Sequence, residues 1–206
     1  MSIFKLDDVH IMLDLETLDT EPTAAIVSIG AVAFSPLEPP GQWAHLSPSL
    51  VFPSGVESRF YRSIIVSDAM KYGTVGGDTL TWWAGQEDSA RISAFHGSYF
   101  LADALAAFAW WVGRVGKFPY IWCNPAHFDF TILENAYRKT GIKVHKCWDF
   151  RAGRCYRTFR HLFEPMFPDL KFEEPKVKHH ALEDAMAQAK HMQKIVQALS
   201  SSSVGA

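Results

Sequence analysis

Two carboxylates close an apolar segment near the start of this 206-residue chain, in the stretch HIMLDLET at residues 10–17. Residues two apart in a strand point to the same face, so Asp14 and Glu16 are expected side by side at the end of the strand. Burying an ionised carboxylate is costly unless the group is paired or binds a metal. A divalent cation such as Mg²⁺ would compensate both charges. The alternative is an exposed strand end with a solvated pair.

A third acid follows another apolar strand, in the stretch WCNPAHFDF at residues 122–130. The strand ends at Cys123, Asn-Pro breaks it, and Asp129 comes at the opening of a helix. Asp is a favoured N-cap residue, so helix capping is the simpler interpretation of Asp129 taken alone.

The third stretch is KHHALEDA at residues 178–185, at the start of the last predicted helix. Asp184 lies about 100° around the axis from the core position Ala185, at the flank of the buried face. A histidine with a pKa near neutrality can remove a proton from water, which suits His179 or His180 beside such an acid. The alternative is a polar helix face with incidental acids and histidines. Together, the three stretches suit two-metal phosphodiester hydrolysis, in which carboxylates hold two ions about 3.5–4 Å apart.

These side chains need elements that bring them together. Apolar, β-branched runs predict strands at residues 10–15, 24–34, 58–64 and 118–124. Helices are predicted from the N-cap Asp78, from near Ser98, over residues 129–139 with a stop at Gly141, and through the long C-terminal segment. The apolar face of that last helix consists of Leu182, Ala185, Ala189, Met192, Val196 and Leu199. Strands first and then mixed elements predict one α/β domain over residues 1–199 with a mixed sheet, followed by a flexible tail at 200–206.

Composition sets broader limits. Hydrophobic residues make up 48% and charged residues 20%, which is typical of a folded globular protein. No apolar run approaches the length of a membrane span and no secretory leader is visible, so no membrane association is expected. Three scattered cysteines, Cys123, Cys147 and Cys155, indicate reduced thiols and a cytoplasmic location. The net charge of −2 argues against coating long duplexes and for binding a short stretch or an end of nucleic acid.

The combination of DLET, a distant HFD and H-x4-D resembles the DEDD-type 3′–5′ exonucleases of the histidine subclass, which have a ribonuclease-H-like fold. The resemblance spans roughly residues 9–197. Within that family the chain is most similar to the phage exonuclease A and exonuclease VIII-like branch. The segments that carry this likeness are MLDLETLDTEPTAAIVSIGAVAF, TLTWWAGQ, RCYRTFRHLF and HHALEDAMAQA.

The resemblance implies four metal-ligating acids: Asp14, Glu16, Asp129 and Asp184. It also implies two ions, Mg²⁺ or Mn²⁺, and a general base five positions before the last acid, which is His179. Helix geometry alone favours His180, which shares a face with Asp184. The conflict disappears if His179 precedes the first turn on a flexible loop. The chain departs from the resembled enzymes at position 180, where they often carry Asn.

The resemblance further implies that Thr17 and Leu18 contact the terminal nucleotide, with the apolar side chain wedged against its base. One of the adjacent residues Trp82 and Trp83 is a candidate for stacking on a base, and we assign that role to Trp82. The alternative is one packed and one surface tryptophan. Trp110 and Trp111 lie in an apolar helix and are both expected in the core.

The expected activity is removal of nucleoside 5′-monophosphates from the 3′ ends of single-stranded DNA, RNA or both. Asp14, Glu16 and Asp184 are expected to hold one ion, and Asp14 with Asp129 the second. A homodimer is a further expectation. Two alternatives are a nuclease-fold module that binds nucleic-acid ends or nucleotides without cutting, and a ribonuclease-H-like endonuclease.

Overall fold

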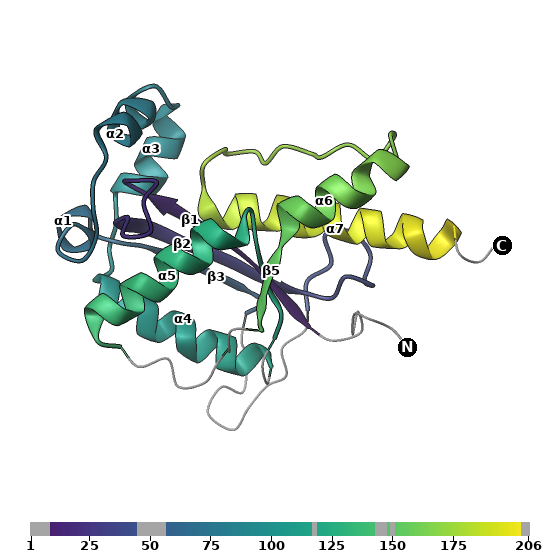
Figure 1. Ribbon diagram of the computed structural model, residues 1–206, viewed down its shortest axis with the longest axis horizontal. Helices are drawn as coiled ribbons and strands as arrows, with labels where there is room; N and C mark the ends of the chain where they lie inside the picture. The colour runs from purple at the N-terminus through teal and green to yellow at the C-terminus, as the bar shows by residue number, and fades with distance from the viewer. Residues whose placement is uncertain (1–8, 45–56, 117–118, 143–147, 149–150, 203–206) are drawn as a thin grey trace.

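The computed structural model describes residues 9–44, 57–116, 119–142, 148 and 151–202 (Figure 1). The strands are β1 (His10–Thr17), β2 (Ile26–Phe34), β3 (Arg59–Ser63), β4 (Ile121–Cys123) and β5 (Gly153–Cys155). The α-helices are α1 (Val66–Ala69), α2 (Gly77–Ala84), α3 (Asp88–Phe95), α4 (Leu101–Val115), α5 (Ala126–Thr140), α6 (Tyr156–Phe163) and α7 (Ala181–Ser202). A short 3-10 helix, η1 (Glu164–Met166), follows α6.

The five strands form one mixed sheet in the order β3-β2-β1-β4-β5. β1, β2 and β3 pair antiparallel, whereas β4 runs parallel to β1 and β5 parallel to β4. Helices α4 and α5 cover one face, and α6 and α7 cover the other (Figure 1). This is the predicted α/β architecture with a central mixed sheet flanked by helices.

Side chains of β1 alternate between the two layers. Ile11, Leu13 and Leu15 enter the core on the α4 and α5 side, and Met12 enters the core on the α7 side. Because the side-chain period of a strand is two, Asp14 and Glu16 continue the Met12 side and face α7. The predicted juxtaposition of these two acids therefore holds.

The start of α7 packs directly on the backbone of β2. Gly30 is the β2 partner of Asp14 in the antiparallel register. A Cβ atom on Gly30 would clash with backbone atoms of Ala181 and Leu182, so only glycine permits this approach. The contact brings the first turn of α7, with Asp184, over the β1–β2 pair.

Several predicted boundaries differ from the structure. α2 begins before Asp78, with Gly76 as its N-cap, and α4 begins three residues after Ser98. α5 ends where predicted, because Gly141 takes the left-handed conformation at φ 70°.

α3, β5 and α6 were not predicted. β5 is only three residues long and α3 is short and polar, whereas Tyr156, Phe159 and Phe163 of α6 recur at helical spacing and are a signal in the sequence for that helix.

The C-terminal prediction also needs correction at its boundary. α7 continues through Ser202, so residues 200–202 belong to the helix and not to a tail. Residues 203–206 and Cys147 lie outside the described residues.

The expectation that both tryptophans of α4 are buried is wrong for Trp110. Trp111 is 3% exposed, whereas Trp110 is 47% exposed. Consecutive helical residues point about 100° apart, so the core-facing side of α4 accommodates only one of them. In the described part of the chain, no helix has the length and apolar character needed to cross a membrane.

Candidate active site

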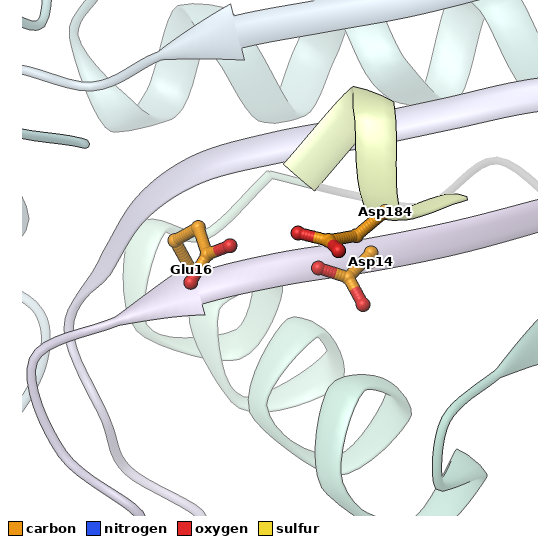
Figure 2. Close-up of side chains that lie close together, drawn as sticks. All are labelled: Asp14, Glu16 and Asp184. Carbon is orange, nitrogen blue, oxygen red and sulfur yellow. The ribbon is translucent and has the colours of Figure 1, made fainter. Parts of the chain in front are cut away.

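Three carboxylates converge at the end of β1. Asp14 and Glu16 from β1 and Asp184 from α7 each offer an oxygen within 4.8 Å of the others. Figure 2 shows the Asp184 carboxylate reaching across from α7 between the two strand acids. This grouping brings together the stretches at residues 10–17 and 178–185, which lie near opposite ends of the chain.

Asp184 is fixed by the start of its own helix. The His180 N–H donates to Asp184 Oδ2 at 3.1 Å, and the Asp184 N–H donates to the His180 carbonyl at 3.0 Å. The first bond satisfies an N–H group that a helix N-terminus leaves unpaired, and the second is an ordinary i to i−4 bond of the helix. The side chain is thereby oriented before any ligand binds.

Asp129 lies near these acids at a gap in the sheet, close enough to act on the pKa of Asp14 and Glu16, but it is not one of the three carboxylates grouped within 4.8 Å. β4 ends at Cys123, so it pairs with β1 only around Ile11 and Met12. Asp129 replaces the missing strand, because its Oδ1 accepts a hydrogen bond from the Leu15 N–H at 3.0 Å. The N-cap interpretation of Asp129 is wrong, since Pro125 holds that position and Asp129 is the fourth residue of α5.

The other oxygen of Asp129 has no hydrogen-bond partner among the described residues, although it is buried. Buried polar atoms are normally satisfied, so an unpartnered carboxylate oxygen beside three more acids fits a cation or an ordered water. The donors at this site are all hard oxygens, which suit Mg²⁺ or Mn²⁺.

The pKa values of the four acids also indicate that this site requires bound cations. Burial, and then the charges of the neighbouring acids, raise the pKa of Asp14 and of Glu16 well above the ordinary range. Burial also raises the pKa of Asp129 to about 7 and that of Asp184 to about 6. The fully ionised cluster is therefore unfavourable at neutral pH unless cations bind to it.

Gln188 was not predicted as part of this site. Its Nε2 donates to Asp14 Oδ1 at 3.1 Å from a position one turn after Asp184 on α7. The side chain is 4% exposed, and its Oε1 lacks a hydrogen-bond partner among the described residues. The i, i+4 spacing from Asp184 is a sequence signal that would have identified it.

The two histidines before α7 have different surroundings. His180 stacks on Tyr61 with ring centroids 4.4 Å apart, and its Nδ1 accepts the Glu183 N–H at 3.4 Å. His179 precedes the helix with φ 58°, and its ring packs edge-on against Trp82 at 4.6 Å. Burial lowers the pKa of both rings. Because α7 begins at Ala181, the helix-face argument for His180 does not apply to this part of the chain.

A hollow of about 420 Å³ adjoins Glu16 between the end of β1 and α2. It is lined by Leu15, Glu16, Thr17, Asp19, Thr20, Asp78, Thr79, Trp82, Trp83 and Phe128. Trp82 is 44% exposed, whereas Trp83 is buried and donates its indole N–H to the Thr17 carbonyl at 2.9 Å. The pair therefore consists of one packed and one surface tryptophan, as the alternative interpretation stated.

Thr17 and Leu18, which were both predicted to contact the substrate, lie in different surroundings in the structure. Thr17 lines the hollow, and its hydroxyl donates to the Asp19 carbonyl at 2.7 Å. Leu18 is 1% exposed and belongs to the main core. Its side chain is thus not presented as a wedge for a base, because the turn after β1 directs it inward.

The sheet order and the flanking helices give a ribonuclease-H-like fold. Solved structures share this fold. The nuclease domain of 3′hExo, a DEDDh family member bound to rAMP, matches with a TM-score of 0.57 and 11% identity over 93% of this chain and 92% of that one. S. pombe Pop2p in a Mg²⁺- and Mn²⁺-bound form matches with a TM-score of 0.56 and 11% identity, over 90% of this chain and 81% of that one.

A third structure, cell-death related nuclease 4, matches with a TM-score of 0.55 and 12% identity over 93% of this chain. This chain spans 64% of the length of that protein. No curated protein sequence matches the chain.

The family model of the Rv2179c-like 3′–5′ exoribonuclease domain matches residues 9–196. The chain therefore belongs to this family of 3′–5′ exoribonuclease domains. Its assignment to the DEDD type stays a prediction. The narrower likeness to the phage exonuclease A branch stays a prediction.

Proposed function

We propose that this chain is a divalent-metal-dependent exoribonuclease that removes nucleoside 5′-monophosphates one at a time from the 3′ end of RNA. The observation that carries the proposal is the convergence of Asp14, Glu16 and Asp184 within 4.8 Å, beside a hollow of about 420 Å³. RNA is the substrate named for the family to which the chain belongs.

In this proposal, Asp14, Glu16 and Asp184 hold one ion, and Asp14 with Asp129 holds a second. Mg²⁺ or Mn²⁺ at such a pair of sites would lower the pKa of a bound water and stabilise charge on the leaving oxygen. The unpartnered oxygen of Asp129 supports its assignment as a ligand. Gln188 orients Asp14 through their hydrogen bond.

His179 accepts a proton from the water whose oxygen bonds to phosphorus. The bond from phosphorus to the 3′ oxygen of the preceding nucleotide breaks, and that oxygen takes a proton from solvent to become a hydroxyl. The position of His179 outside α7 and its contact with Trp82 support this choice over His180, whose ring is held between Tyr61 and the first turn of α7. In the structure the His179 ring lies against Trp82 in the lining of the hollow. To act as the base, His179 must therefore reorient toward the acids when RNA binds.

The hollow beside Glu16 receives the terminal nucleoside. Trp82 and Phe128 supply apolar surfaces for the base, and stacking on an aromatic ring contributes about 1–3 kcal/mol per base. Thr17 and Asp19 supply polar groups for the ribose. Leu18 acts in this proposal by supporting the turn from the core.

Digestion of 5′-labelled single-stranded RNA and DNA, with Mg²⁺, with Mn²⁺ and with EDTA, tests the proposal. We expect a ladder that shortens one nucleotide at a time on RNA, free nucleoside 5′-monophosphate, and no reaction in EDTA. Cleavage of circular RNA would instead indicate an endonuclease. Binding of 3′ ends without product, with either metal, would indicate an end-binding module.

A further inference from the structure

A cluster of arginines marks the segment formed by β5 and α6. Residues 151–161, with the sequence RAGRCYRTFRH, contain four arginines and no acidic residue, in a chain whose net charge is −2. Two of these arginines are occupied within the fold. Arg154 donates to the Gly153 carbonyl at 2.9 Å and lies over the Tyr120 ring at 4.2 Å, and Arg160 donates to Glu164 at 2.7 Å.

Arg157 differs from its neighbours in the segment. It is exposed in the first turn of α6, and its Nε–H donates to Asn124 Oδ1 at 3.3 Å. Within the described ranges, no carboxylate forms an ion pair with it. An arginine has five N–H donors, so the outer edge of this guanidinium is available to an anion.

The topology places Arg157 at the catalytic edge of the sheet. β4 and β5 run in the direction of β1, so the residues that follow them, Asn124 and Arg157, lie at the same edge as Asp14 and Glu16. The positive charge of Arg157 is near enough to Asp129 to oppose the rise in the pKa of that acid.

The sheet order places β5, which Arg157 follows, on the β4 side of β1, whereas the hollow is lined by the end of β1 and by α2. Arg157 lies in the first turn of α6, and Figure 1 shows α2 on one side of the start of α7 and α6 on the other. An RNA strand with its last nucleoside in the hollow and its last phosphodiester at the acids therefore continues toward the start of α6.

We propose that Arg157, oriented by Asn124, binds the phosphate immediately upstream of the scissile phosphate and so guides the RNA strand along the start of α6. This inference rests on the proposed exoribonuclease function. A planar guanidinium forms paired hydrogen bonds with phosphate oxygens, which suits this position better than a flexible ammonium group. His161, one turn later on the same exposed face of α6, extends the track.

The test combines a protein change with a substrate change. Two RNA oligonucleotides of equal length are compared, one of ordinary RNA and one with a single uncharged methylphosphonate at the linkage upstream of the terminal one. The measured quantity is kcat/KM for release of the first 3′ nucleotide. For the wild-type protein, we expect the neutral linkage to lower it about tenfold, as loss of a charge-assisted contact predicts.

Arg157→Gln is expected to lower kcat/KM about tenfold on ordinary RNA and to be almost insensitive to the neutral linkage. Arg157→Lys keeps the charge and should retain part of the sensitivity. The matched control is Arg138→Gln, which removes the same charge from an exposed position at the far end of α5 and should behave as the wild type.

Equal sensitivity to the neutral linkage in Arg157→Gln and wild type would overturn the inference and would indicate that Arg157 only supports Asn124 and Asp129. Failure of the proposed function gives a different result, because the wild-type protein would then release no nucleotide from either oligonucleotide.

Discussion

Asp14 interacts electrostatically with each of the other three acids of the site. Its pKa is raised by burial and then by Asp129, Glu16 and Asp184, and Gln188 donates a hydrogen bond that favours its ionised form. A group in this position binds cations strongly but destabilises the metal-free fold, since the mutual repulsion of the acids is present only in the folded state.

Asp14→Asn should therefore abolish exonuclease activity while leaving the fold intact. We expect a loss of at least about 10³-fold in kcat, because a ligand shared by both proposed ions is removed. The Asn side chain keeps an oxygen for Gln188, so the melting temperature in EDTA should be equal to or above that of the wild type. Rates on labelled RNA and thermal denaturation measure the two quantities, and unchanged hydrolysis by the variant would refute the assignment.

The two histidines before α7 offer a second comparison of single residues. His179→Ala should lower kcat by about 10²–10⁴-fold, the range expected for loss of a general base. His180→Ala should mainly lower the melting temperature, because it removes a ring stacked on Tyr61 and an acceptor for the Glu183 N–H. Single-turnover rates and melting curves of both variants decide the matter. A larger rate loss in His180→Ala would reverse the assignment.

At the scale of elements, two local features of the sheet build the site. β4 is only three residues long, which leaves the Leu15 N–H to Asp129. Gly30 in β2 lets the start of α7 approach the sheet closely enough to bring Asp184 to Asp14. Neither feature contributes a catalytic side chain, yet each determines where one lies.

Gly30→Ala tests the second feature. The added methyl group has no room against the backbone of α7, so we expect destabilisation of about 1–3 kcal/mol and a clear loss of activity. Gly116→Ala is the matched control, because a Cβ there has no atom of the described, non-neighbouring residues within 4 Å. Chemical denaturation and exonuclease rates of both variants give the result. A Gly30→Ala protein with wild-type stability and rate would show that α7 adjusts without disturbing the acids.

At the scale of the whole molecule, the acids link stability to pH. Asp129 has a pKa of about 7 in the folded protein and near its ordinary value of 3.8 when unfolded. Between these values the folded state holds a proton that the unfolded state has lost, so this group lowers stability as the pH rises through the interval. The penalty is absent below the unfolded pKa and fully present above the folded one.

Asp129→Asn should remove that dependence and keep the acceptor for Leu15. We expect the melting temperature of the variant minus that of the wild type, measured in EDTA, to be larger at pH 8 than at pH 5. The subtraction cancels the titration of histidines and cysteines common to both proteins. Added Mg²⁺ should raise the melting temperature of the wild type more than that of the variant at pH 8. A difference that shrinks with rising pH would contradict the assignment.

The sequence by itself determined the fold class, the long strands and the identity of the candidate acids. Buried central strands such as β1 and β2 are apolar over their whole length, and a carboxylate that interrupts such a run stands out. The sequence also identified Gly141 as a helix end, because the left-handed conformation favours glycine locally.

Only the tertiary structure decided how these residues meet. In the structure, Asp129 bonds to the edge of β1 and is not a helix cap, and Gln188 bonds to Asp14. Leu18 is buried in the core, and Trp110 is exposed. A local sequence pattern shows only the spacing of apolar residues within one segment. The outcomes above depend instead on where β4 ends and on how closely α7 approaches Gly30. Such contacts join residues more than a hundred positions apart, and no single segment of the sequence contains them.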